Sequence, residues 1–259
     1  MRHTILAAAL LSATATAQTK VSGDPYDSDP VSIVADPCPT HPKPTNGWQM
    51  YNLHMLTRDH GQFCRYAAQN AAIKTPVRVV FIGDSITDNW VGADASLFTN
   101  GVVDRSVSGQ TTSQMLIRFR NDVILLHPKA AHIMAGTNDI AGNTGAATMV
   151  TVEGDIASMA DLAHAHCIKV ILASVPPAAA FPWSPAKRPV QQIADLNIWL
   201  RGYAKAYGYS YVDYHAALTT PEGDMKPGLS TDGVHPTPAG YAVMKPLPLA
   251  VIADTLGSR

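Results

Sequence analysis

Four short segments of this 259-residue chain carry side chains that could together attack a carbonyl group and stabilise the product of that attack. The first segment is Gly83-Asp84-Ser85-Ile86-Thr87, in which the hydroxyl of Ser85 is a candidate nucleophile. It follows the apolar run 77–82 directly. A helix that starts here would direct free backbone N–H groups at Ser85, and such groups can bind the oxyanion that forms. Since Asp or Ser after a strand is usually a helix N-cap, this segment alone does not indicate an enzyme.

The second and third segments supply candidate donors to the same oxyanion. Gly109 lies in Ser106-Val107-Ser108-Gly109-Gln110, and its backbone N–H is not obstructed by a side chain. Asn138 lies in Gly136-Thr137-Asn138-Asp139, and its carboxamide N–H can donate without carrying a charge. Each segment follows an apolar run. Taken separately, the glycine is typical of a turn and the asparagine of a turn or a helix cap.

The fourth segment, Asp232-Gly233-Val234-His235-Pro236, supplies a candidate general base. On a turn that contains glycine, the Asp232 carboxylate can accept the Nδ1–H of His235, which fixes the tautomer and leaves Nε2 free to take a hydroxyl proton. An isolated Asp-x-x-His pattern is more often a surface feature. The four segments together, however, provide a nucleophile, two donors and an oriented base, which is the set that acyl transfer needs.

The stretches between these segments predict one α/β domain. Short apolar runs, which we expect to be strands, alternate with longer amphipathic stretches, which we expect to be helices. The apolar runs cover 77–82, 102–103, 131–134, 170–175 and 210–212, and the helical stretches lie near 48–73, 112–126, 147–166, 189–207 and 238–256. This alternation predicts a three-layer α/β/α sandwich with a five-stranded parallel sheet. Ligands of such sheets bind beyond the carboxyl ends of the strands, and all four segments follow strands.

In their order and spacing, the four segments resemble the sequence blocks of the SGNH (GDSL-type) hydrolases, a family named after its Ser, Gly, Asn and His. The matching residues are Ser85, Gly109, Asn138 and His235, with Asp232 at the position of the triad carboxylate. The resemblance extends over about residues 77–241. The first block reads Gly-Asp-Ser-Ile instead of Gly-Asp-Ser-Leu, and the chain lacks the Gly-x-Ser-x-Gly elbow of lipase-type α/β-hydrolases.

This resemblance implies a flavodoxin-like SGNH fold and a serine esterase that works through a Ser-His-Asp triad and an acyl-enzyme. The backbone N–H groups of Ser85 and Gly109 and the side chain of Asn138 would form the oxyanion hole. Such a mechanism requires no metal and no organic cofactor. A non-catalytic glycan-binding module on the same scaffold is the alternative from another class, and its simplest sign, a missing block residue, is not found here.

The N-terminal residues suggest export. Residues 1–17 combine Arg2, the short apolar run 5–11 and the small residues Ala15-Thr16-Ala17, which is the pattern of a signal peptide. We therefore expect a secreted or periplasmic protein. Residues 18–46 are rich in proline and without periodicity, which predicts an extended lead-in, and 47–259 would form the hydrolase domain. No later apolar run reaches the roughly 20 residues that a membrane-spanning helix needs.

The charge and the cysteine content of the chain limit the classes of molecule that it can bind. The chain has 19 basic and 20 acidic residues, and removal of 1–17 takes away only Arg2, which leaves 18 against 20 and a net charge of −2. Because no Lys/Arg cluster stands out, we expect no nucleic-acid partner. Cys38 and Cys64 could form a disulfide in an exported protein, and that pairing stays open. We expect Cys167 to be a buried free thiol. No spacing indicates zinc.

The substrate is the least constrained feature. The loop 176–189 carries Phe181 and Trp183 and follows a predicted strand, so Trp183 either contacts the substrate or packs onto the domain, and Trp90 has the same two options. Members of the resembling family include carbohydrate acetylesterases, arylesterases, thioesterases and lysophospholipases. Export and the lack of long apolar stretches favour short acyl groups on a small-molecule or glycan ester. The oligomeric state stays open.

Overall fold

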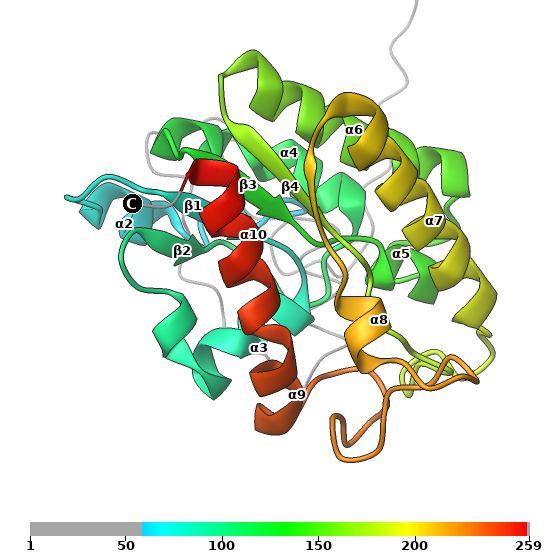
Figure 1. The fold of residues 1–259 in the computed structure, drawn as a ribbon. Helices are drawn as coiled ribbons and strands as arrows, with labels where there is room; N and C mark the ends of the chain where they lie inside the picture. The colour runs from blue at the N-terminus through cyan, green and yellow to red at the C-terminus, as the bar shows by residue number, and fades with distance from the viewer. Residues whose placement is uncertain (1–58, 258–259) are drawn as a thin grey trace, which may run out of the picture. The chain divides into compact units, whose positions relative to one another are not determined.

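A computed structural model describes residues 59–257, which all belong to one compact unit (Figure 1). The predicted signal peptide 1–17, the lead-in 18–46 and the first part of the predicted helix 48–73 lie outside the described residues. Among residues 59–257, every helix is too short or too polar to cross a membrane.

The sheet has five parallel strands, as predicted. They are β1 (Val79–Ile82), β2 (Val102–Asp104), β3 (Ala130–Ile133), β4 (Lys169–Ala173) and β5 (Ser210–Val212), in the spatial order β2-β1-β3-β4-β5. Each neighbouring pair is parallel. All residues of the two central strands β1 and β3 are buried, because helices cover both faces of the sheet. Burial of each large apolar side chain contributes about 1.5–3 kcal/mol to the free energy of folding. These strands therefore hold the loops that follow them in place.

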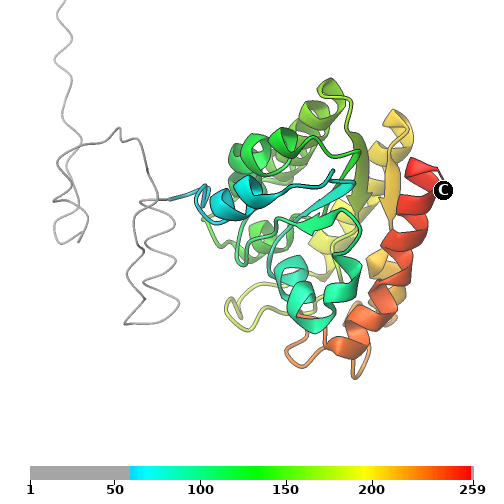
Figure 2. The same ribbon diagram turned by 90° about the vertical axis from the view of Figure 1, so that its left-hand side faces the viewer.

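Helices form the outer layers. The α-helices are α2 (Ala67–Ala72), α3 (Ser85–Ala93), α4 (Thr112–Asp122), α5 (Thr137–Ala141), α6 (Met149–Ala165), α7 (Val190–Tyr207), α8 (Tyr214–Leu218), α9 (Pro238–Met244) and α10 (Pro246–Leu256), with 3-10 turns η1 (Ala95–Leu97) and η2 (Ile124–Leu126). On one side α4 packs against α6, and α6 packs against α7 and β4. On the other side α10 packs against β5 and α9, which also contacts α3 (Figure 2). The predicted α/β/α sandwich is therefore confirmed.

Several expectations about single elements are wrong. The predicted helix 238–256 is two helices, α9 and α10, because Pro246 stands at the first position of α10 and has no N–H to donate. Of the predicted helix 48–73, the described part is helical only from Ala67 to Ala72, and residues 59–66 are mainly turns.

Two cysteines lie within the described residues. Cys167 is free, as expected, but it is exposed instead of buried. It has a φ of 58° and lies in the turn between α6 and β4, outside both elements. Cys64 is disulfide-bonded, and its expected partner, Cys38, lies outside the described residues.

The strand register brings the loops of the first three strands to one edge of the sheet. The backbone N–H of Val107, after β2, donates to the carbonyl of Gly83, after β1, at 3.0 Å. That of Met134, after β3, donates to the carbonyl of Ile82 at 3.1 Å. Gly83 permits the close approach of the loop after β3, because a Cβ there would lie 3.1 Å from the carbonyl oxygen of Met134, and it would also lie 2.6 Å from Oγ1 of Thr87. The residues that follow β1, β2 and β3 are thus held next to one another.

Candidate active site

Ser85 is the first residue of α3, at the point where the chain leaves β1. Asp84 is the N-cap of this helix, and its Oδ1 accepts the backbone N–H of Ile86 at 2.9 Å. Burial raises the pKa of Asp84 to about 6, although the bond from Ile86 acts in the opposite direction. Asp84 therefore has the capping role that is usual for an Asp after a strand. Ser85 consequently lies at the positive end of the α3 dipole, where a developing negative charge is stabilised.

Ser85 and His235 meet, although 150 residues separate them in the sequence. The Ser85 Oγ and the His235 Nε2 are 2.8 Å apart. His235 Nδ1 lies 2.6 Å from Oδ2 of Asp232, so an imidazole that carries its proton on Nδ1 presents Nε2 as an acceptor to the hydroxyl. The nucleophile, base and carboxylate predicted from the sequence therefore form one connected chain of hydrogen bonds.

The carboxylate of Asp232 is held in its ionised form. Burial raises its pKa, but the hydrogen bonds from the side chain and backbone of His235 and from the backbone N–H of Val234 outweigh this effect and bring the pKa to about 2. Its Oδ1 accepts both backbone N–H groups, at 2.8 Å from His235 and 2.9 Å from Val234. Asp232 thus remains a negatively charged acceptor for His235 across the neutral pH range.

Ser230 supports the same turn, although no sequence pattern indicates it. Its Oγ donates to the carbonyl of His235 at 2.8 Å and accepts the backbone N–H of Gly233 at 2.9 Å. Ser230 therefore connects both ends of the Asp-x-x-His segment. A serine that bonds to nearby backbone is common in turns, so only its contacts with the His235 turn distinguish Ser230 from other loop serines.

The three predicted oxyanion donors have the hydrogen-bonding capacity for that role. Among residues 59–257, neither the backbone N–H of Ser85 nor that of Gly109, whose φ is +82°, has a hydrogen-bond acceptor. Asn138 is buried, with 2% of its surface exposed, and its Nδ2 donates to the carbonyl of Gln110 at 3.0 Å. Because an amide nitrogen carries two protons, one N–H of Asn138 remains for a ligand.

The two candidate substrate-contacting tryptophans have different positions. Trp183 is 39% exposed, and its ring centroid is 5.8 Å from that of His235. Trp90 is fully buried and stacks on Tyr241 with centroids 5.1 Å apart. The prediction that Trp90 contacts substrate is therefore wrong, since its ring packs within the aromatic core between α3 and α9.

Comparison with known proteins supports the same assignment. Residues 81–243 match the model of the GDSL-like lipase/acylhydrolase family. The chain belongs to this family. Membership makes it a carboxylic ester hydrolase. No match was found among the curated proteins.

Solved structures include close relatives of this GDSL acylhydrolase. A predicted acylhydrolase from Bacteroides fragilis NCTC 9343 is 44% identical, with 76% of this chain and 99% of that chain covered and a TM-score of 0.74. A GDSL-like lipase from Bacteroides thetaiotaomicron VPI-5482 is 45% identical over 75% of this chain and 98% of that chain, with a TM-score of 0.73. A catalytic mutant of Axe2, an acetylxylan esterase from Geobacillus stearothermophilus, is 21% identical over 70% and 95%, with a TM-score of 0.56, and shares the fold.

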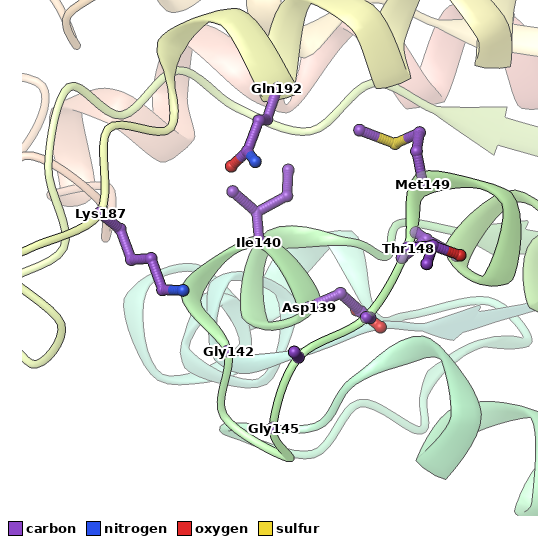
Figure 3. Close-up of a pocket in the computed structure, with 11 residues that line it drawn as sticks. Asp139, Ile140, Gly142, Gly145, Thr148, Met149, Lys187 and Gln192 are labelled. Carbon is purple, nitrogen blue, oxygen red and sulfur yellow. The ribbon is translucent and has the colours of Figure 1, made fainter.

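A pocket lies beside α5, the helix of the acylhydrolase that carries Asn138. Ile140, Met149, Lys187 and Gln192 are among its lining residues, and the side chains of Ile140 and Gln192 point toward one another across it (Figure 3). The residues of the Ser85–His235–Asp232 chain do not line this pocket. Within residues 59–257, no three His, Cys, Asp or Glu side chains are grouped so that they could hold a metal ion.

Proposed function

We propose that this GDSL acylhydrolase is a serine esterase that cleaves short-chain acyl esters, with carbohydrate acetates as its preferred class of substrate. The observation that carries the proposal is the 2.8 Å contact between the Ser85 Oγ and the His235 Nε2, with Asp232 behind the imidazole. This arrangement has the geometry of an activated serine nucleophile. A non-catalytic glycan-binding module would need none of these contacts.

The reaction proceeds in two steps. The Ser85 Oγ attacks the ester carbonyl while His235 Nε2 takes the hydroxyl proton, and the oxyanion accepts hydrogen bonds from the backbone N–H groups of Ser85 and Gly109 and from the Nδ2 of Asn138. The carbonyl re-forms as the C–O bond of the ester breaks, and His235 returns the proton to the departing alcohol. Water then attacks the acyl-enzyme in the same way, which releases the acid and restores Ser85.

Two features support a short acyl group. Trp183 lies beside the imidazole of His235, with ring centroids 5.8 Å apart, where a bulky indole would restrict a long acyl chain. A long acyl chain needs an extended apolar surface. Among residues 59–257, exposed large apolar side chains are instead distributed over separate helices, such as Ile117 on α4, Val150 on α6 and Ile198 on α7.

Residues 1–17 have the composition of a signal peptide, which supports a secreted or periplasmic location. At such a location the enzyme would meet soluble esters and polysaccharides. Mass spectrometry of the mature protein tests this proposal: an N-terminus near Gln18 supports export, and an intact N-terminus in purified protein from its native cells contradicts it.

The experiment that tests the activity is a chain-length series of p-nitrophenyl esters, run beside acetylated xylan and acetylated monosaccharides, with Ser85→Ala as the blank. We expect the highest kcat/KM for acetyl or other short esters and release of acetate from the glycans. A maximum at long acyl chains would indicate a lysophospholipase or thioesterase, and hydrolysis of aryl esters alone would indicate an arylesterase. Glycan binding without any turnover would leave only the non-catalytic module.

A further inference from the structure

Asn143, in the turn after α5, connects three parts of the site. Its Nδ2 donates to the Oδ1 of Asn138 at 2.8 Å and to the carbonyl of Gly109 at 3.1 Å. Its Oδ1 accepts the indole N–H of Trp183 at 3.0 Å. One carboxamide therefore contacts two residues assigned to the oxyanion hole and also the tryptophan that lies against His235.

This network permits only one orientation of the Asn138 carboxamide. Its Oδ1 faces the amino group of Asn143, and its Nδ2 faces the carbonyl of Gln110. Rotation of the amide by 180° would place two amino groups face to face on one side and two carbonyl oxygens on the other. In the orientation observed, one proton of Nδ2 bonds to Gln110 and the second remains available.

The groups at the two ends of this hydrogen-bond network can act only as donors or only as acceptors, so they fix its direction. The indole N–H of Trp183 can only donate, and the carbonyls of Gly109 and Gln110 can only accept. The donor at Trp183 determines which atom of Asn143 is the oxygen, and Asn143 then determines which atom of Asn138 is the oxygen. The direction of every bond is thus set without any titratable group.

A purely local role for Asn143 does not account for these contacts. Asn143 is not among the described residues with positive φ, so its backbone does not call for an asparagine. Its side chain bonds to three different segments, the loop after β2, helix α5 and the loop after β4, instead of capping its own turn.

We propose that Asn143 is a positioning residue of the oxyanion hole, which holds the Asn138 carboxamide with an N–H toward the oxyanion and is itself oriented by Trp183. This inference rests on the proposed function, because it concerns how a donor of the proposed oxyanion hole is held. It predicts that a loss of Asn143 lowers kcat through Asn138 and leaves substrate binding nearly unchanged.

A double-mutant cycle on p-nitrophenyl acetate hydrolysis tests this relation. Asn138→Ala should lower kcat by about 10²–10³-fold. Asn143→Ala should lower kcat by about 10–100-fold with KM changed less than about threefold, and it should cost less than about threefold when added to Asn138→Ala. Equal losses from Asn143→Ala in both backgrounds, or no loss in either, would overturn the proposal.

Thr144→Ala is the matched control. Thr144 is the exposed neighbour of Asn143 in the same turn, and its hydroxyl bonds to Thr111 instead of to Asn138. This variant should keep kcat within about twofold of the parent. A loss as large as that of Asn143→Ala would show that the turn as a whole, and not the carboxamide, matters.

Trp183→Phe tests the outer end of the network, because it removes the indole donor and keeps an aromatic ring. We expect Trp183→Phe to lower kcat about threefold in the parent enzyme and to cause no loss in the Asn143→Ala background. The same loss in both backgrounds would mean that Trp183 acts on the substrate alone and does not orient Asn143.

A measurement that does not depend on turnover separates this inference from the proposed function. In the ¹⁵N-labelled full chain, the side-chain amide resonances of Asn138 should shift in Asn143→Ala and stay in place in Thr144→Ala. Unchanged Asn138 resonances in Asn143→Ala would contradict the inference, whatever the activity. Full activity of Ser85→Ala would contradict the proposed function, and the Asn138 resonances would still decide the positioning role.

Discussion

Trp90 and Trp183 are identical side chains in opposite environments. Trp90 is fully buried, and besides Tyr241 its ring contacts Tyr214 and Phe98 at centroid distances of 6.0 and 6.4 Å. Trp183 is more than a third exposed and contacts His235 and Asn143. The first therefore joins α3, which carries Ser85, to α9, which follows His235. The second lies where a substrate would arrive.

This comparison separates two ways of supporting catalysis. The Trp90 cluster contributes free energy of folding and holds the segments of Ser85 and His235 at a fixed separation. Trp183 packs on the core only through Phe181, with ring centroids 5.2 Å apart, and it lies beside His235. Variants in the two regions should accordingly differ in whether they change stability or kinetics.

Trp90→Ala should have the largest effect, a loss of about 3–5 kcal/mol in the free energy of unfolding, because it leaves a cavity in the aromatic core. Urea denaturation followed by circular dichroism measures this loss. Since the site depends on the same packing, activity should decrease together with the folded fraction. A Trp90→Ala variant with unchanged stability but a lower kcat/KM would instead indicate that Trp90 contacts the substrate.

His132 makes the core near Trp90 sensitive to acid. It is fully buried on β3, bonds through Nε2 to the Tyr214 hydroxyl at 3.0 Å, and burial lowers its pKa to about 3. Because the unfolded chain binds a proton below about pH 6.5 and the folded chain does not, this residue costs up to about 1.4 kcal/mol of stability per pH unit on acidification between these values. His132→Gln, which keeps a polar partner for Tyr214, should lose less stability than the parent between pH 7 and 4. Parallel stability curves for the two proteins would show that His132 does not titrate in this way.

Trp183→Ala should alter kinetics and spare the fold. We expect kcat/KM for p-nitrophenyl acetate to decrease by about tenfold, equivalent to about 1.4 kcal/mol of transition-state stabilisation. The free energy of unfolding should fall by less than in Trp90→Ala, since the Trp183 ring is 39% exposed and packs on the core only through Phe181. A loss of stability comparable to that of Trp90→Ala would remove the distinction between the two regions.

Tyr241→Phe should have the smallest effect and refine the view of the core. It keeps the ring that stacks on Trp90 and removes only the hydroxyl that donates to the carbonyl of Ile86 at 2.8 Å. The expected cost is about 1 kcal/mol of stability, with kcat/KM unchanged. A much larger cost would assign the contact between α3 and α9 to this hydrogen bond instead of to ring packing.

The sequence predicted the architecture and the central residues because their signals are local or repetitive. Buried parallel strands appear as apolar runs, and the blocks with Ser85, Gly109 and Asn138 each follow such a run closely, whereas α8 and a loop lie between β5 and the block with His235. Trp90 was misassigned although a signal was present. It lies four residues after Ile86 on α3, so the two side chains share one helix face, and both are buried.

Other features depend on contacts that the sequence does not reveal. Asn143 is a polar loop residue whose importance comes from a partner in a distant segment, Trp183. Ser230 bonds within the His235 turn, and no sequence pattern distinguishes it from other loop serines. Cys167 is exposed and has a left-handed backbone conformation that is uncommon at a residue other than glycine, and no sequence pattern predicted either feature.

The central claim is that Ser85 forms the acyl-enzyme with His235 as its base. The most direct measurement is mass spectrometry of peptides from enzyme that is quenched in acid during turnover of p-nitrophenyl acetate. We predict one added acetyl group on the peptide that contains Ser85, and a much slower appearance of this adduct in His235→Ala. An acetyl group on another residue that forms and decays at the rate of turnover, with Ser85 unmodified, would contradict the mechanism.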